Sequence, residues 1–215
     1  MTSSREPRII DIATWARREQ YELFRRFGYP YFSLTADVDV TALRESCRSA
    51  GASFTIGLVY AIARAANKTP AFRQRLRGEQ VIEHEVVHPS ITVRIDDDRF
   101  SFRNLPFQEP YAAFAREAAG RMEEARRSPS LWVEEDQDEF LYLTAIPWIS
   151  FTAMVHPIPL DPPDSVPRIA WGKYRMQGSR VVMPLNIHVH HALIDGAHAG
   201  RFYELLQQEL DAFSA

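Results

Sequence analysis

The sequence is poor in cysteine, with Cys47 as the single thiol among 215 residues. One cysteine excludes an intrachain disulfide. An excess of charge of one sign is also lacking, because 25 Lys and Arg stand against 28 Asp and Glu, for a formal net charge of −3. No global field therefore draws the chain to nucleic acid or to an anionic membrane, and any anionic ligand must be held by local charges.

Long hydrophobic runs are absent as well. The longest candidate covers residues 54–66, which is too short for a membrane span and includes Arg64. The N-terminal segment carries mixed charges instead of the apolar core of a signal peptide, so we expect a cytoplasmic location. With 46% hydrophobic and 25% charged residues, the composition is that of an ordinary globular protein. No repeat or long linker divides the chain, and we expect a single domain over residues 1–215.

Apolar periodicity predicts a mixture of helices and strands. We expect helices over residues 15–26, 42–50, 54–67, 111–127 and 201–210. We expect strands over residues 8–12, 31–38, 80–85, 90–96, 100–105, 141–145, 151–156, 169–176 and 181–190. Prolines predict a loop over residues 157–167, and the acidic residues 134–139 favour a solvated turn over a cation site. Short turns between several strands favour mixed pairing, so the expected fold class is α+β, a two-layer mixed sheet with helices packed on one face.

The most informative segment is residues 190–196, where two adjacent histidines precede Asp195 and Gly196. Histidine is the only side chain whose unperturbed pKa lets it take and return a proton near neutral pH. The segment joins a strand pattern to a helix pattern, where Gly196 can adopt backbone angles closed to other residues and Asp195 can cap the helix. The pattern therefore predicts a general base at a strand-to-helix junction.

Two other interpretations of these histidines stay open. His188, His190, His191 and His198 lie close in sequence, and His188 and His190 share one face of a strand, as zinc ligands can. No HExxH pattern accompanies them and Cys47 is distant, so we expect no metal site. The second alternative, less favoured than a general base, is a buried polar cluster of histidines without a catalytic role.

Four further segments match the pattern of one family. Residues 15–19 match its N-terminal helix, residues 32–35 its next strand, residues 145–148 its Leu-Pro-Trp-like segment and residues 172–174 its Ala-Lys-Tyr segment. In this order and spacing the matches cover almost the whole chain. The chain therefore resembles the type A chloramphenicol O-acetyltransferases, trimeric acetyl-CoA-dependent enzymes that share a CoA-dependent acyltransferase fold with the dihydrolipoyl acyltransferase core.

This resemblance implies transfer of an acetyl group from acetyl-CoA to a hydroxyl of chloramphenicol. It also implies a homotrimer with active sites between subunits, and acetyl-CoA as a co-substrate with no tightly bound cofactor. By the same resemblance His191 is the base that deprotonates the acceptor and then protonates the departing thiolate. Asp195, paired with Arg17, braces the site. Thr144 supplies the oxyanion hydroxyl where the family has a serine, and Ala170 replaces a threonine that anchors a water.

The resemblance also implies the residues that bind the co-substrate. Trp148 and Tyr174 match positions that line the pantetheine tunnel, and Lys173 matches a lysine near the nucleotide phosphates. A second phosphate-facing lysine, present in some members, aligns approximately with Ser53. A lysine can supply the local positive charge that the net charge of −3 does not.

The acceptor pocket implied by the resemblance contains Leu23, Phe24, Phe32 and Phe100, which suits an apolar aromatic molecule that carries a hydroxyl. Phe24 stands where the family has a tyrosine, and the missing phenol removes a polar contact. One alternative is therefore an acyltransferase of the same mechanism with another hydroxyl or thiol acceptor. A dihydrolipoyl acyltransferase core is less favoured, because no lipoyl domain or Pro/Ala-rich linker precedes the segment. Ala170 keeps open a relative that binds the drug or CoA without turnover.

Overall fold

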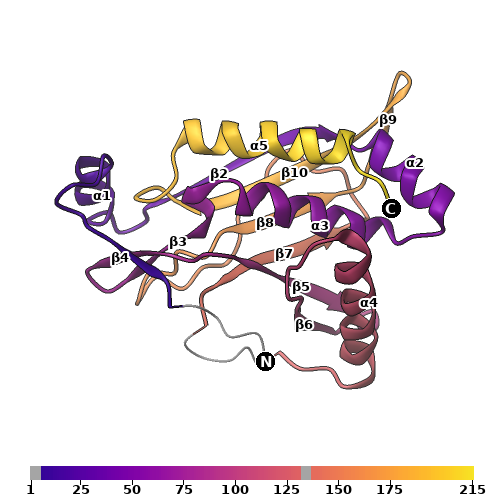
Figure 1. The fold of residues 1–215 in the computed structure, drawn as a ribbon, viewed down its shortest axis with the longest axis horizontal. Helices are drawn as coiled ribbons and strands as arrows, with labels where there is room; N and C mark the ends of the chain where they lie inside the picture. Colours follow the sequence, from indigo (N-terminus) through magenta and orange to yellow (C-terminus); the bar gives the residue numbers. More distant parts are fainter. Residues whose placement is uncertain (1–5, 132–136) are drawn as a thin grey trace.

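Two β-sheets form the framework of the computed structural model, which describes residues 6–131 and 137–215 (Figure 1). The larger sheet has, in order, β2 (Tyr31–Asp39), β10 (Arg180–His190), β8 (Arg168–Gly172), β7 (Phe140–Ile146), β5 (His88–Arg94) and β6 (Phe100–Asn104), with β9 (Arg175–Gln177) also paired to β10. The smaller sheet has β1 (Arg8–Ile10), β4 (Gln80–Glu83) and β3 (Gln74–Arg77). Strands β5, β7 and β8 are parallel, whereas β10 is antiparallel to β8 and β2. The predicted mixed sheet is confirmed.

Helices cover the larger sheet on one face. The described helices are α1 (Arg18–Phe24), α2 (Thr41–Ala50), α3 (Phe54–Asn67), α4 (Tyr111–Arg127) and α5 (Gly196–Asp211), with a 3-10 turn, η1, at Pro70–Arg73. Helices α3 and α5 pack against each other over the sheet, and α4 packs beside β5 and β6 (Figure 1). The start of α5 and α1 lie toward one end of the larger sheet, and α2 and β9 lie toward the other (Figure 1).

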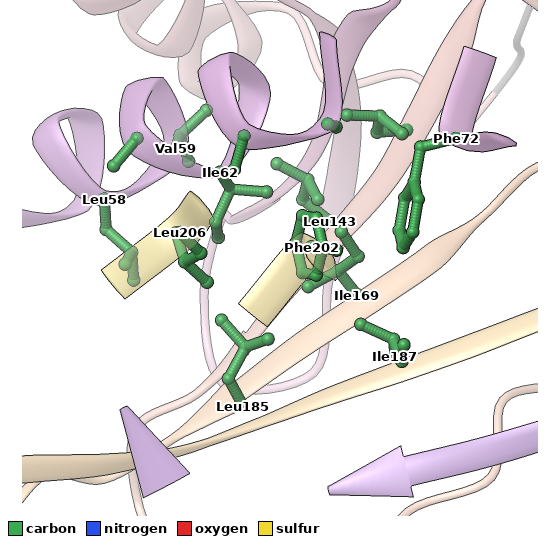
Figure 2. Close-up of a cluster of buried hydrophobic side chains, with 14 of the residues drawn as sticks. Leu58, Val59, Ile62, Phe72, Leu143, Ile169, Leu185, Ile187, Phe202 and Leu206 are labelled. Carbon is green, nitrogen blue, oxygen red and sulfur yellow. The ribbon is translucent and has the colours of Figure 1, made fainter. Parts of the chain in front are cut away.

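Helix α3 is buried around most of its circumference, which explains why its sequence is apolar on nearly every side. Its side chains and those of α5 meet the strands β7, β8 and β10 in one apolar core (Figure 2). Phe72 of η1 stacks on Phe202 of α5, with ring centroids 4.4 Å apart. Leu185 and Ile187 of β10 face these helices (Figure 2), and α5 is thereby fixed relative to the strand that precedes it.

The opposite face of β10 is polar. Because side chains alternate along a strand, Asn186 and His188 point away from the helices. The Asn186 amide donates to the Met154 carbonyl at 3.2 Å, and the backbone N–H of His156 donates to Nδ1 of His188 at 3.1 Å. These bonds fasten residues 151–156 to the sheet through side chains. The predicted strand over residues 151–156 is therefore wrong, and this segment is a loop.

The predicted strand over residues 169–176 is interrupted after Gly172. The N–H of Lys173 donates to the Ile149 carbonyl at 2.7 Å instead of continuing a sheet ladder. A Cβ at Gly172 would lie 2.8 Å from the same carbonyl oxygen, so this close approach requires a glycine. The strand consequently appears as β8 and the short β9, with residues 173 and 174 between them.

Other helices and strands begin or end at residues that differ from those predicted. The helix expected over residues 15–26 is shortened to α1, and the helix expected from residue 201 begins at Gly196. Strand β3 was not predicted. Of the acidic turn, residues 134–136 lie outside the described residues, while Asp138 forms an ion pair with Arg77 at 2.6 Å and contacts His84 at 2.8 Å. In the described ranges, no helix combines the length and apolar content needed to cross a membrane.

Candidate active site

His191 immediately follows β10, in the turn that leads into α5. Its backbone N–H donates to the Pro30 carbonyl at 2.7 Å, and its Nδ1 lies 3.2 Å from the Ile194 carbonyl oxygen. A carbonyl oxygen can only accept a hydrogen bond, so Nδ1 carries the hydrogen. The neutral imidazole therefore has its free lone pair on Nε2, which is the protonation state that a general base requires.

Two aromatic side chains hold the His191 ring in place. Phe24 of α1 stacks on it with centroids 3.9 Å apart and planes 11° apart, and Phe32 of β2 contacts it at 5.0 Å with a tilt of 60°. Both were predicted as acceptor-pocket residues, and the structure brings both to the histidine. The neighbouring Leu23 is 53% exposed on α1. The imidazole thus lies against an apolar surface that favours an apolar acceptor.

Asp195 is the N-cap of α5. Its Oδ1 accepts the backbone N–H groups of Ala197 at 3.0 Å and His198 at 3.3 Å, and its Oδ2 accepts from the Arg17 guanidinium. Burial raises the pKa of the Asp195 carboxyl, but the hydrogen bonds from Arg17 and the His198 backbone outweigh it and lower that pKa to about 2. In the described chain this carboxylate makes no hydrogen bond to the His191 imidazole, and its bonds to Arg17 and to the start of α5 hold the turn instead.

Arg17 connects α1 to this turn. Besides its ion pair with Asp195, its second terminal nitrogen donates to the backbone carbonyl of His191 at 3.4 Å. The guanidinium is mostly buried, with 14% of its side chain exposed. The contact was expected from the resemblance alone, since 178 residues separate Arg17 from Asp195. His198 was not predicted in this role, yet its Nδ1 accepts the backbone N–H of Asp195 at 3.3 Å and so completes the capping box of α5.

The other histidines of the segment are structural. His188 and His190 are buried on β10, with 1% and 2% exposure. His188 has both ring nitrogens engaged, since Nδ1 accepts from the His156 N–H and Nε2 lies 3.0 Å from the Tyr29 hydroxyl. Nδ1 of His190 accepts from the Ala192 N–H at 3.2 Å. This geometry supports the buried polar cluster over the zinc interpretation.

Among the described residues, the metal-ligating side chains that lie close enough to share an ion are instead His84, Asp138 and Glu139. They are remote in sequence from residues 188–198, and Asp138 is already paired with Arg77 through both carboxylate oxygens. That ion pair places a positive charge where a cation would bind.

Two buried histidines and the half-buried His156 should make the protein less stable in acid. Burial lowers the pKa of His156, His188 and His190 to about 4 each, against about 6.5 in an unfolded chain. The free energy of unfolding should therefore be highest above pH 6.5 and should fall as the pH falls toward 4. Over that range the unfolded state binds protons that the folded state does not. For His190 alone the loss is about 3 kcal/mol. Urea unfolding between pH 7.5 and 4.5, at constant protein concentration, should show this loss.

His190→Asn provides the comparison for that measurement. Its stability at pH 7.5 should be lower than that of the wild-type protein, but it should decline less steeply between pH 6.5 and 4.5, since one of the titrating groups is gone. An unchanged slope would contradict the assignment of His190 as a neutral buried group.

The remaining predicted residues gather at the other end of the larger sheet. Thr144 lies on β7, Trp148 follows the end of that strand, and Lys173 and Tyr174 follow the end of β8. Trp148 and Tyr174 are 61% and 44% exposed. Phe100 opens β6 and pairs in register with Arg94, whose guanidinium lies 5.6 Å from the Trp148 ring.

The predicted site thus divides into two clusters. We call the first the histidine cluster; its members are Arg17, Phe24, Phe32, His191 and Asp195. We call the second the tryptophan cluster; its members are Phe100, Thr144, Trp148, Lys173 and Tyr174. Each contains part of what an acyl transfer needs. The histidine cluster holds the predicted base, and the tryptophan cluster holds the predicted hydroxyl donor and the residues expected to bind the co-substrate.

Strand register separates the two clusters within one chain. Thr144 pairs with Ala170, and Ala170 pairs with Asn186. His190 lies four residues beyond Asn186, or about 13 Å along the strand, and Thr144 is two strand spacings of about 4.8 Å to the side. Because β8 is antiparallel to β10, residues after Thr144 lead further away from His191. An oxyanion donor must lie about 3 Å from the developing charge, so Thr144 and His191 of one chain cannot act on the same substrate.

Two positions that depart from the family pattern have clear surroundings. Ala170 is fully buried in the centre of the sheet between Thr144 and Asn186. Ser53 caps α3, with its hydroxyl accepting the Ile56 N–H at 3.4 Å.

The contact between His191 and the Ile194 carbonyl could not be predicted from the sequence, because every residue has a backbone carbonyl and no residue type marks this one.

Comparison with known proteins finds relatives in the family that the sequence resembles. The family profile described as Chloramphenicol acetyltransferase matches residues 7–207. Chloramphenicol acetyltransferase 2 of Escherichia coli is 31% identical over 204 residues, which is 94% of this chain and 96% of that protein. A solved chloramphenicol acetyltransferase superposes with a TM-score of 0.89 at 27% identity, covering 95% of this chain and 100% of that one.

A truncated catalytic core of the 2-oxoacid dehydrogenase multienzyme complex from Thermoplasma acidophilum superposes with a TM-score of 0.69 at 19% identity, over 93% of this chain and 96% of that one. At this identity the likeness concerns the fold alone. It agrees with the expected acyltransferase fold class.

Proposed function

Because this chain belongs to the chloramphenicol acetyltransferase family, and is therefore an acyltransferase, we propose that it transfers the acetyl group of acetyl-CoA to a hydroxyl of chloramphenicol. The observation that carries the proposal is the hydrogen bond from Nδ1 of His191 to the Ile194 carbonyl, at 3.2 Å, which leaves Nε2 free to act as a base. The apolar ring of Phe24 against that imidazole supports an aromatic acceptor.

In the proposed mechanism Nε2 of His191 removes the proton from the acceptor hydroxyl while the oxygen attacks the thioester carbonyl. The tetrahedral intermediate then collapses, the carbon–sulfur bond breaks, and the departing thiolate recovers the proton from Nε2. The products are the acetyl ester and free CoA, and the histidine returns to its neutral state. Because Nδ1 keeps its hydrogen bond throughout, one nitrogen serves in both steps without rotation of the ring.

The other predicted residues have supporting roles in this mechanism. Asp195 and Arg17 hold the turn that presents His191. The Thr144 hydroxyl donates to the oxyanion of the tetrahedral intermediate, a contact worth about 3 kcal/mol in the barrier. Trp148, Lys173 and Tyr174 bind acetyl-CoA.

We further infer that each active site forms between two copies of the chain. The distance between Thr144 and His191 in one chain supports this arrangement, since the histidine cluster of one copy must meet the tryptophan cluster of another. A cyclic homotrimer would then contain three equivalent sites. We also propose that residues 1–215 form one domain. We propose a cytoplasmic location, because the single thiol, Cys47, is free, and free thiols are typical of proteins in the reducing cytoplasm.

A direct assay tests the proposed activity. Purified protein mixed with acetyl-CoA and chloramphenicol should release thiol, and mass spectrometry should find the drug heavier by one acetyl group. A panel of other small alcohols and thiols serves as the comparison for acceptor choice. Thiol release only with another acceptor would refute chloramphenicol as the substrate. Binding of drug and CoA without any release would refute the enzyme and favour the sequestering relative.

A further inference from the structure

A cavity of about 250 Å³ lies between α2, the start of α3 and the residues that follow β8. Its lining consists of Arg44, Cys47, Arg48, Ala52, Phe54 and Tyr174. It is at the end of the molecule where α2 and β9 lie, opposite the start of α5 (Figure 1). Complete binding pockets for drug-sized ligands measure about 300–1,000 Å³, so this one suits one end of a longer molecule.

The cavity carries uncompensated positive charge. Arg44 and Arg48 are one turn apart on α2 and therefore share a side of that helix. Neither has a carboxylate partner among the residues that the structure describes, whereas most other described arginines form ion pairs. Cys47 adds no negative charge, because burial raises the pKa of its thiol. Two guanidinium groups with free donors in one cavity are suited to bind an anion with several oxygens.

Aromatic side chains form the adjoining wall. The Arg44 guanidinium lies 5.5 Å from the centre of the Tyr174 ring, and Phe54 contacts the same ring edge-to-face at 6.1 Å. Tyr174 is 44% exposed although it is a large aromatic. Aromatic faces of this kind bind bases by stacking, and arginine beside them adds to the attraction.

The start of α3 adds a third feature to the same cavity. Phe54 and Ala52 flank its N-cap, Ser53, and the first turn of the helix contains no acidic residue. The N-terminus of a helix presents backbone N–H groups and a partial positive charge to an anion. Position 53 is where some relatives have a phosphate-facing lysine by resemblance. Here the serine caps the helix, and the positive charge comes instead from α2, across the cavity.

We propose that Arg44 and Arg48 bind the phosphate groups at the nucleotide end of acyl-CoA. The inference rests on the proposed function for the identity of the ligand, but the cavity and its charges stand independently of catalysis. Tyr174 and Phe54 provide the surface for the base, and Lys173, next to Tyr174 in the chain, provides a further cation. The thioester end then extends from this cavity along Trp148. The two arginines thus raise the affinity for CoA and make the protein select CoA thioesters over shorter thioesters that lack the phosphate groups.

The decisive variant is Arg44→Gln combined with Arg48→Gln, which removes both charges while keeping long side chains that favour a helix. Calorimetric titration with CoA should show at least about 10-fold weaker binding. In the thiol-release assay, kcat/KM for acetyl-CoA should fall by a similar factor through KM, while kcat/KM for S-acetylpantetheine, which has no phosphate, should remain unchanged. Arg44→Lys with Arg48→Lys should recover part of the affinity.

The matched control is Arg116→Gln combined with Arg127→Gln on α4. These arginines also lack a carboxylate partner in the described residues, and the double variant changes the net charge equally, but neither lines the cavity. It should bind CoA as the wild-type protein does. Equal CoA affinity in the wild-type protein and the α2 variant, or an equal loss with acetyl-CoA and S-acetylpantetheine, would overturn the proposal. Absence of thiol release from the wild-type protein would instead refute the proposed function and leave the calorimetric test intact.

Discussion

Replacing His191 with glutamine should lower kcat by about 10²- to 10⁴-fold, which is the usual contribution of a positioned general base. Glutamine retains the size of the side chain and can still pack against Phe24, but it has no lone pair basic enough to take the proton of a hydroxyl. The affinity for CoA should be unchanged, because the variant leaves intact the residues proposed to bind CoA, which are those of the cavity on α2 and of the tryptophan cluster. The thiol-release assay and calorimetric titration with CoA measure the two effects separately.

The adjacent histidine is the control for this result. His190 is buried and accepts a hydrogen bond from Ala192, so His190→Asn should reduce stability and leave kcat near the wild-type value at a temperature where the variant is folded. The reverse outcome, in which His190→Asn is inactive and His191→Gln is active, would show that the base was assigned to the wrong ring. Circular dichroism establishes that both variants are folded.

Local sequence patterns predicted the elements around the base well. The alternation along residues 181–190 predicted β10, and Asp195 was expected to cap the following helix and does so. Both predictions depend on interactions within a few residues. The tautomer of His191 could not be predicted in this way, because it depends on how the turn brings the Ile194 carbonyl back toward the ring.

Predictions failed where distant partners decide the conformation. The segment 151–156 has the composition of a strand, but the amide of Asn186 and the ring of His188 bind it to the polar face of the sheet as a loop. Strand β8 ends at Gly172 because the Ile149 carbonyl approaches it too closely for a side chain. Neither contact leaves a signal in the local pattern.

The resemblance implied active sites between subunits, but it did not show which of the predicted residues lie at which end of the sheet. Motifs show which residue types are present, whereas the strand order shows which of them can meet. Thr144 and His191 match one active site by resemblance, yet the register places them at least four residues and two strands apart in the same sheet. That separation has a testable consequence.

Mixing two inactive variants should restore activity. His191→Ala subunits keep an intact tryptophan cluster, and Thr144→Ala subunits keep an intact histidine cluster. Alone, the first should lack the base, and the second should lose about 10²- to 10³-fold in kcat because it lacks an oxyanion donor. If each site joins the histidine of one copy to the threonine of the next, equimolar random co-assembly into trimers leaves about a quarter of the sites intact. The mixture should then regain about a quarter of the wild-type kcat.

A mixture of His191→Ala with Asp195→Asn is the matched control, because both changes fall in the histidine cluster. Every site that such a trimer forms contains one or other damaged cluster, so activity should stay at the level of the separate variants. Tagged subunits purified in tandem establish that mixed assemblies exist. If they do and the first mixture stays inactive, the two clusters do not meet across subunits, and Thr144 is not the hydroxyl that completes the site of His191.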